Sequence, residues 1–227
     1  SFAMRLKQNW QTMITYKTNN SGRDIVHETN KAFTYGELDS RLIPFISLPS
    51  PASSRLGERS LFNRSHTLNL NMLQRINETS QVNVQVTYIN DRQETFSKRT
   101  AEYFSKRGNK VSDNEKHYIA KTNELFAKVK YENNANSQYL KNELSTNLNW
   151  NKQLLIERGT NPHEMNGNLP VFTLKDNLLL MRKYGKRLYS FESKNIMEVR
   201  PQQLTMDTLN QKINQHYYET NNNVSGS

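Results

Sequence analysis

Apolar and polar residues alternate strictly on both sides of a short polar stretch near residue 78. Residues 68–72 read Leu-Asn-Leu-Asn-Met, and residues 82–88 read Val-Asn-Val-Gln-Val-Thr-Tyr. Residues 77–80, Asn-Glu-Thr-Ser, favour a turn between the two runs. A period of two places the apolar side chains on one face of a strand, whereas a helix needs them every three or four positions. The pattern therefore predicts an antiparallel hairpin over residues 64–90.

The same pattern recurs along the chain and predicts further hairpins. Tight turns are expected near residues 20, 78, 135 and 185, the last around Tyr184-Gly185-Lys186. The predicted strands are residues 9–17, 24–35, both arms of 64–90, 125–131, 140–150, 174–183, 187–199 and 211–220. Pro201 is expected to break the strand that precedes it.

Long connections are predicted between these hairpins, at residues 36–63, 91–118 and 151–170. The first contains Pro44, Pro49 and Pro51, so it cannot be an interior strand. The predicted fold is therefore all-β, an antiparallel up-and-down meander of about 8–10 long strands.

Short turns and long loops alternate in this prediction, which is typical of a transmembrane β-barrel, whereas soluble meanders usually mix loop lengths on both ends. The aromatic residues give an independent indication. Trp10, Tyr88 and Trp150 are expected at the long-loop end of the apolar faces, and Tyr16 and Tyr131 at the short-turn end. Two girdles of aromatic residues that bound an apolar band are expected at the two membrane interfaces. The fold prediction is therefore a segment of a transmembrane β-barrel.

The composition has two explanations. Hydrophobic residues make up 34% and the mean hydropathy is -0.88, against the usual ~45–50% apolar residues. Such a chain is either disordered or built of strands with one apolar face. Aromatic residues make up 10% and lie inside the alternating runs, whereas disordered chains have few. The composition thus favours one-faced strands.

The formal net charge of +10 and the pI near 9.7 raise the question of an anionic partner. The basic segment 98–116, which contains Tyr103 and Phe104, is the best candidate for binding nucleic acid. Its competing interpretation is a solvated extracellular loop, or one that touches the phosphates of lipopolysaccharide. We regard nucleic acid as an unlikely partner.

No residue combination predicts catalysis or metal binding. The sequence has no Cys, and this excludes disulfides, thiolate metal sites and thiol catalysis. His163-Glu164 lacks the second His of a zinc-protease motif, and the glycines form no phosphate-binding motif. The five histidines are scattered along the sequence: His27, His66, His117, His163 and His216. We therefore expect no enzyme activity, no catalytic residue, no cofactor and no metal.

Polar residues of the alternating strands would face the lumen of a barrel. These are Asn69, Asn71, Gln85, Lys128, Lys130, Lys141 and Glu143. They would either line a solute path or form a hydrated wall in contact with a plug, and no substrate-binding residue can be singled out. The sequence also contains no signal peptide and no apolar run of helical transmembrane length.

Three phrases resemble strand entries of outer-membrane barrels from Bacteroidota. Residues 63–71, Asn-Arg-Ser-His-Thr-Leu-Asn-Leu-Asn, resemble the recurring pattern N-x-S-H-x-x-x-x-N. Residues 130–133 with 139–142, and residues 200–204, resemble the same proteins. The family is that of TonB-dependent-receptor-like proteins with a carboxypeptidase-regulatory-like N-terminal module, and the similarity runs from about residue 9 to the end.

The resemblance implies a closed barrel of about twenty-two strands with a plug in its lumen, energised by the TonB system. The chain is then expected to be a barrel fragment: residues 1–4 a cloning remnant, 5–220 a single β-barrel segment and 221–227 a flexible tail. The expected function is solute binding and uptake in the bacterial outer membrane, with lipid, plug and the rest of the barrel as partners. The alternatives are a soluble all-β adhesion or carbohydrate-binding module and, third, a basic nucleic-acid-binding protein.

Overall fold

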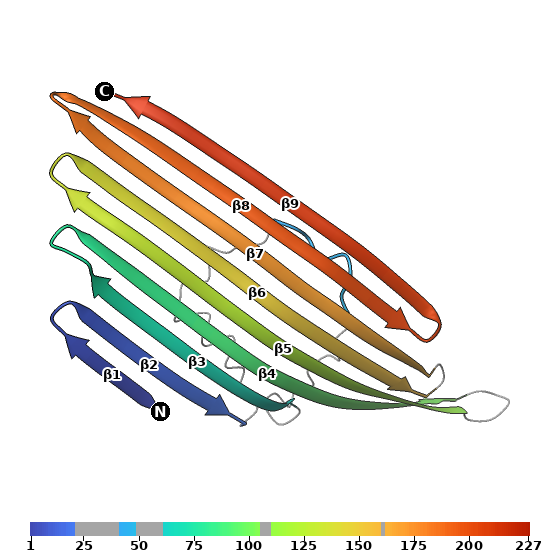
Figure 1. Cartoon of the computed structure of the whole chain (residues 1–227). Helices are drawn as coiled ribbons and strands as arrows, with labels where there is room; N and C mark the ends of the chain where they lie inside the picture. Colours follow the sequence, from blue (N-terminus) through green and yellow to red (C-terminus); the bar gives the residue numbers. More distant parts are fainter. Residues whose placement is uncertain (21–40, 49–60, 105–109, 160–161) are drawn as a thin grey trace.

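The computed structural model of the chain is a single antiparallel sheet (Figure 1). It describes residues 1–20, 41–48, 61–104, 110–159 and 162–227, and these residues contain strands but no helix. The nine strands lie side by side in chain order, and β1 and β9 form the two open edges. Their bounds are β1 Phe2–Lys7, β2 Trp10–Asn19, β3 Leu61–Arg75, β4 Ser80–Tyr103, β5 Lys110–Ala135, β6 Gln138–Arg158, β7 His163–Tyr184, β8 Arg187–Met206 and β9 Leu209–Gly226. The predicted all-β up-and-down meander is confirmed; the sheet is not closed into a barrel.

The tight turns expected near residues 78, 135 and 185 are confirmed, because they link β3 to β4, β5 to β6 and β7 to β8. Gly185 has a φ of 59°, a conformation that glycine adopts without steric cost. The turn expected near residue 20 falls partly on residues 21 and 22, which lie outside the described residues, but the hairpin expected from it does not hold for β2. β2 pairs with β1 through a short turn after Lys7 and with β3 on its other side, so both of its neighbours are taken. The predicted strand 24–35 lies outside the described residues.

Two of the predicted long connections are mostly strand. β4 and β5 are 24 and 26 residues long, and they pair from Ser80↔Asn133 to Tyr103↔Lys110. β6 and β7 likewise pair up to Glu157↔His163. In these outer halves polar residues lie on both faces, and the apolar residues do not alternate with them: residues 154–156 read Leu-Leu-Ile. The ladder still forms, because its hydrogen bonds join backbone groups whatever the side chains are.

Pro201 does not end its strand, contrary to the prediction. β8 continues to Met206, and Pro201 instead interrupts the ladder with β7. The paired residues pass from Asn168↔Gln203 to Phe172↔Val199, and the gap places Pro201 opposite Pro170. Neither proline has an N–H to donate, so the ladder opens for a few residues and then resumes.

The C-terminal part corrects two further expectations. β8 and β9 are joined by a tight turn at Asp207, which has a φ of 47°, at the end of the sheet where long links were predicted. At the same end, the links from β4 to β5 and from β6 to β7 span only residues 104–109 and 159–162. The predicted alternation of short and long links therefore fails at these three connections, and the long link at this end joins β2 to β3. β9 continues to Gly226 and pairs with β8 as far as Tyr189↔Gly226, so residues 221–226 are strand and not a flexible tail. Residues 2–4 are likewise paired, in β1.

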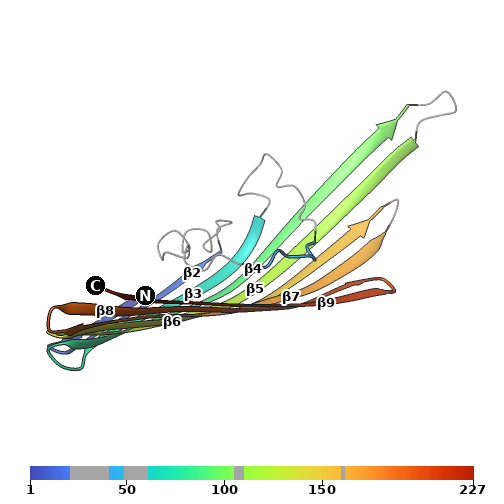
Figure 2. The ribbon, with the colours of Figure 1, turned by 90° about the horizontal axis from the view of Figure 1, so that it is seen from above.

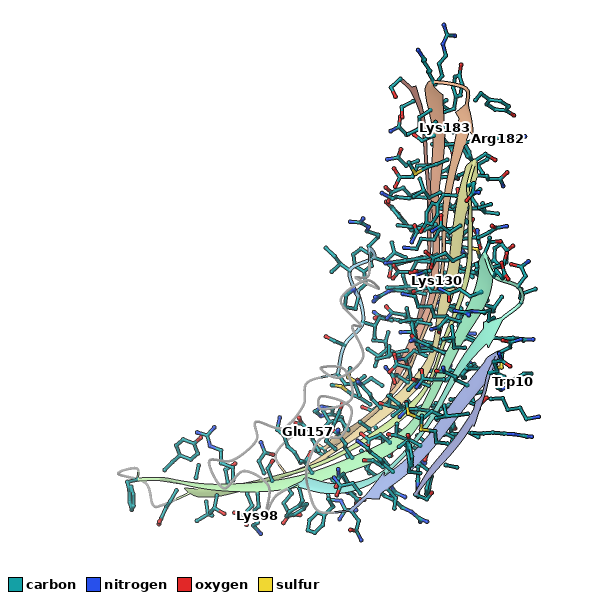
Figure 3. All side chains as sticks on the ribbon, turned by 90° about the vertical axis from the view of Figure 1, so that its left-hand side faces the viewer. Trp10, Lys98, Lys130, Glu157, Arg182 and Lys183 are labelled. Atoms are coloured by element: carbon teal, nitrogen blue, oxygen red, sulfur yellow. The ribbon has the colours of Figure 1, made fainter. Side chains whose placement is uncertain are left out.

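The sheet is bent (Figure 2), and its two faces differ in chemistry. Directly paired residues share a face, so the register defines both faces across all nine strands. One such row runs from Ile14 through Leu70, Val86, Ala127, Thr146, Leu174 and Met197 to Tyr218. Most of its members are apolar. Segment 41–48 contacts the opposite face, which lies on the inner side of the bend (Figure 3). We call these the convex and the concave face.

The aromatic residues lie at both ends of the convex apolar band, but the prediction had two of them exchanged. Trp10 begins β2 next to the short turn, and Tyr16 lies near the end of β2 that leads into the long link. Tyr16 and Tyr88 both pair with Leu68, so they lie at the same level. The error follows from the expectation that a short turn ends β2, because the short turn lies at the start of β2, after Lys7.

Candidate functional site

The concave face carries all seven residues that the sequence predicted for a lumen wall. Asn71, Gln85 and Lys128 are neighbours in one cross-strand row, and Lys130 pairs directly with Glu143 in the next. Asn69 lies two residues from Asn71 on β3, and Lys141 lies two residues from Glu143 on β6, so both share the face of these residues. Period-two alternation alone was sufficient to assign this face.

The charged residues of this face neutralise one another. The Lys128 Nζ lies 2.8 Å from Glu143 Oε1, and the Lys130 Nζ lies 2.9 Å from Glu132 Oε2. A third lysine, Lys141, lies 4.0 Å from Glu143. The wall thus presents alternating charges instead of a field of one sign.

Segment 41–48 crosses the concave face and packs against it. Leu48 is buried with Tyr118 of β5 and Leu155 of β6, and Met165 of β7 packs against the same cluster. Gly167 makes room for Leu48, because a Cβ at Gly167 would lie 2.5 Å from Leu48 Cδ1. The apolar end of the segment is therefore fixed to the middle of the sheet.

The other end of the segment is held by polar contacts. The backbone N–H of Arg41 donates to Glu198 Oε2 at 2.9 Å, and the Gln215 side chain donates to the Ile43 carbonyl at 3.2 Å. Glu198 is fully buried and also accepts from Arg200 Nε at 2.7 Å. A buried carboxylate requires such partners, because its desolvation is costly. Glu198 is thus both an ion-pair partner and the anchor of segment 41–48.

A hollow of about 460 Å³ lies between Arg41 and the concave surface of β6 to β9. Its lining carries both signs of charge: Arg41, Lys141, Lys175 and Lys194 against Glu143, Glu192 and Glu219. Lys194 lies 2.7 Å from Glu192, and Arg41 lies 3.9 Å from Glu219. This arrangement suits a polar solute better than an apolar one.

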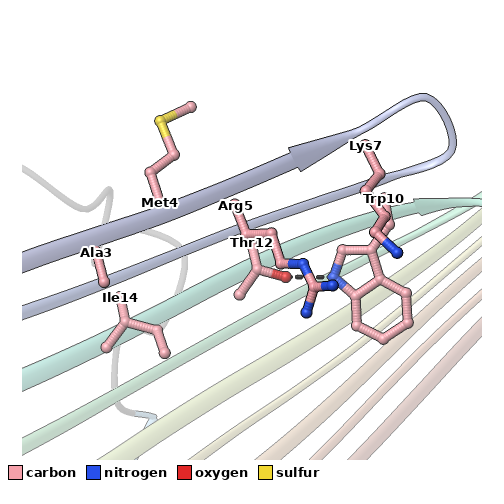
Figure 4. A pocket seen from close by; sticks show the side chains of 7 residues that line it. All are labelled: Ala3, Met4, Arg5, Lys7, Trp10, Thr12 and Ile14. Atoms are coloured by element: carbon pink, nitrogen blue, oxygen red, sulfur yellow. Dashed lines mark hydrogen bonds between the residues drawn. The ribbon is translucent and has the colours of Figure 1, made fainter.

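A second hollow, of about 470 Å³, lies on the convex face at the edge formed by β1 and β2 (Figure 4). It is lined by Ala3, Met4, Arg5, Lys7, Trp10, Thr12 and Ile14, and the Trp10 indole donates to the Thr12 hydroxyl. β1 places its polar residues on the convex face, unlike β2. Arg5 pairs with Thr12 and therefore shares the face of Ile14. The apolar band of the convex face thus begins at β2.

In the described part of the basic segment 98–116, β4 pairs with β5, and the cations Lys98 and Lys116 have acidic partners. Lys98 Nζ lies 3.1 Å from Glu115 and 4.0 Å from Asp113, and Lys116 pairs with Glu157. The hydrogen bond and the charge of Glu115 raise the pKa of Lys98 above its ordinary value. Nearby, burial raises the pKa of the Tyr118 phenol. The segment therefore offers less free positive charge than its sequence suggests.

The histidines do not come together in the described part of the chain. His66 shares a hydrogen bond of 2.7 Å with the Tyr16 hydroxyl, His117 lies 2.6 Å from Glu94, and His163 lies 3.8 Å from Glu157. His27 lies outside the described residues. Among the described residues, no group of three or more His, Asp or Glu side chains could hold a metal ion. The expected absence of an enzyme activity stays a prediction.

Sequence reasoning missed segment 41–48 and its anchor Glu198. One signal was present: residues 42–48 read Leu-Ile-Pro-Phe-Ile-Ser-Leu, an apolar run inside a polar connection. Comparison with protein-family models and with curated proteins finds no match. In the residues that the structure describes, no helix is long and apolar enough to cross a membrane.

Proposed function

We propose that this chain forms part of the wall of an outer-membrane β-barrel that binds and takes up a solute, similar to TonB-dependent receptors. The observation that supports this most is the uncovered apolar band on the convex face. Five of its aliphatic side chains are each 39–44% exposed: Leu68, Val129, Leu144, Leu174 and Met197. No second layer covers this face within the described strands.

An apolar surface of this extent is unfavourable in water. Soluble monomers rarely expose contiguous apolar patches beyond a few hundred Å², and larger ones mark protein or membrane interfaces. Removing the band from water is worth roughly 25 cal/mol per Å². Lipid chains supply such an environment along the whole band, whereas a two-layer sandwich would need a second apolar sheet.

The height of the band suits a bilayer. In β4 it runs from Val82 to Tyr88, six steps of about 3.4 Å or about 20 Å along the strand. Outer-membrane barrels have an apolar band of about 25 Å between two aromatic girdles. The strands are longer than this, since β4 has 24 residues and β5 has 26. Their outer halves would project beyond the membrane on the side of the long links.

The solute would meet the concave face. Segment 41–48 and the mixed charges beneath it leave the hollow of about 460 Å³, which is suited to a polar solute. The parts of the proposal that concern a plug and TonB-driven uptake rest on the resemblance of residues 63–71, 130–133 with 139–142, and 200–204 alone.

The two tryptophans permit a direct test, because Trp10 and Trp150 lie near opposite ends of the band. Single-tryptophan variants, Trp10→Phe and Trp150→Phe, would be folded into vesicles whose lipids carry bromine at shallow or deep positions. We expect both remaining indoles to be quenched, and more strongly by shallow bromines. A folded monomer in plain buffer, with no quenching in vesicles, would refute the proposal and favour the soluble module.

A further inference from the structure

Four cations from four consecutive strands form one row on the convex face. Arg64 of β3 pairs directly with Arg92 of β4, Arg92 with Lys121 of β5, and Lys121 with Lys152 of β6. All four residues are exposed. Neighbouring strands lie about 4.8 Å apart, so the row spans about 14 Å. We call these four residues the cation row.

The row is electrostatically unfavourable without a ligand. Like charges directly opposite one another destabilise a sheet, and this row contains three such contacts in succession. Within the row, Arg92 forms an ion pair with Glu94 of the same strand, at 3.3 Å. Glu94 is itself shared with His117 at 2.6 Å. One shared carboxylate does not balance four cations.

The surface beside the row changes sharply in character. Trp150 lies two residues before Lys152 on the same face of β6, and Tyr88 lies four residues before Arg92 on β4. Beyond them lies the apolar band. A ligand that lies across this boundary must carry several negative charges at one end and apolar groups at the other, which describes a phosphorylated lipid. Nucleic acid would leave its charged backbone against aliphatic side chains.

We propose that the cation row binds the phosphates of a multiply phosphorylated lipid, as in lipopolysaccharide, with the acyl chains against the apolar band. The row lies at the long-link end of the band, which faces outward in outer-membrane barrels. Guanidinium groups bind phosphate oxygens in bidentate fashion, and lysines add point charges. This proposal rests on the proposed function for the acyl-chain contact, but not for the phosphate contact.

The experiment measures binding of the full chain to vesicles of neutral phosphatidylcholine, with and without diphosphorylated lipid A. The row variant is Arg64→Gln/Arg92→Gln/Lys121→Gln/Lys152→Gln. The control variant removes the same charge from four exposed cations elsewhere: Lys17→Gln/Arg75→Gln/Lys183→Gln/Lys186→Gln. Each cation near an anionic surface adds measurably to affinity, so we expect the row variant to lose roughly tenfold or more. The control variant should keep most of the wild-type affinity.

Three outcomes would overturn the proposal. The first is a row variant that binds diphosphorylated lipid A like the wild type, and the second is a control variant that loses as much as the row variant. The third is that the wild-type chain binds duplex DNA in lipid-free buffer as tightly as it binds the vesicles, and that the row variant loses this DNA binding. That result would assign the row to nucleic acid.

Failure of the proposed function gives a different result. Binding to neutral vesicles tests the apolar band alone. The gain in affinity when the vesicles contain diphosphorylated lipid A tests the cation row. A chain that ignores neutral vesicles but binds the phosphorylated ones through the row would refute the membrane proposal and keep the phosphate site. Unfolding midpoints in neutral phosphatidylcholine vesicles check that the row variant folds, and we expect them to rise because the like-charge contacts are removed.

Discussion

Leu48→Ala should release segment 41–48 from the concave face while leaving the sheet intact. Leu48 is 7% exposed and packs with Tyr118 and Leu155. Truncation of a buried Leu to Ala typically costs about 2–5 kcal/mol. Here the cost is expected to fall on the docking of the segment, because Leu48 is buried against side chains of β5 and β6. A cost of about 2–4 kcal/mol corresponds to roughly a 30- to 1,000-fold change in the docking equilibrium.

Hydrogen exchange of the Arg41 backbone amide measures this equilibrium. In the docked segment this amide donates to the buried Glu198 carboxylate at 2.9 Å, so its exchange requires undocking. We expect Leu48→Ala to accelerate the exchange by a factor in the range just given. Ile43→Ala is the matched control, because Ile43 lies on the same segment but is 78% exposed.

The reasoning fails if the Arg41 amide of the wild type exchanges as fast as an unprotected amide. It also fails if Ile43→Ala accelerates exchange as much as Leu48→Ala, because burial would then not decide the docking. Equal exchange in the wild type and in Leu48→Ala would mean that the polar anchors alone hold the segment.

Three further predictions concern the two faces and the buried groups. Val84→Arg on the convex face should lower the folding stability in a bilayer by about 2–4 kcal/mol, whereas Asn83→Arg, next to it on the concave face, should change the stability little. Denaturant titration of the chain folded into vesicles measures both stabilities. Equal effects of the two substitutions would contradict the assignment of the faces. Glu198→Ala removes the carboxylate that pairs with the buried Arg200, and it should lower the free energy of unfolding by about 3–5 kcal/mol. Glu198→Gln should lower it less, because the amide keeps an acceptor oxygen. A urea unfolding midpoint equal to that of the wild type would argue against the buried anchor. Burial raises the pKa of Tyr118, so the folded state holds the phenol proton more tightly than the unfolded state does. The neutral phenol therefore contributes to folding stability, and this stability is lost as the pH rises through the ordinary tyrosine range and above. Tyr118→Phe should therefore reduce the loss of stability at alkaline pH, which thermal unfolding from neutral to alkaline pH would measure.

The sequence alone determined where most strands lie inside the apolar band and which face each residue occupies. Alternation of period two is a local property, so Leu68 to Met72 and Val82 to Tyr88 specify their faces without reference to any partner. The same logic correctly placed Lys128 and Glu143 together on the concave face. Pattern reasoning failed in the outer halves of β4 to β7, because polar residues lie on both faces there and apolar residues such as Tyr118 and Leu155 follow no period of two.

The contacts between strands and across the sheet were decided by the tertiary structure. Arg64, Arg92, Lys121 and Lys152 are far apart in sequence, and each occupies an ordinary exposed position on its own strand. They become one row through the register of three strand pairs, and turn lengths and packing set this register. The docking of segment 41–48 likewise depends on a buried carboxylate more than 150 positions away, at Glu198. Local patterns contain no information about contacts between residues that are far apart in the sequence. Charge repulsion and burial depend on which groups lie close together in space, and only the fold brings these groups together.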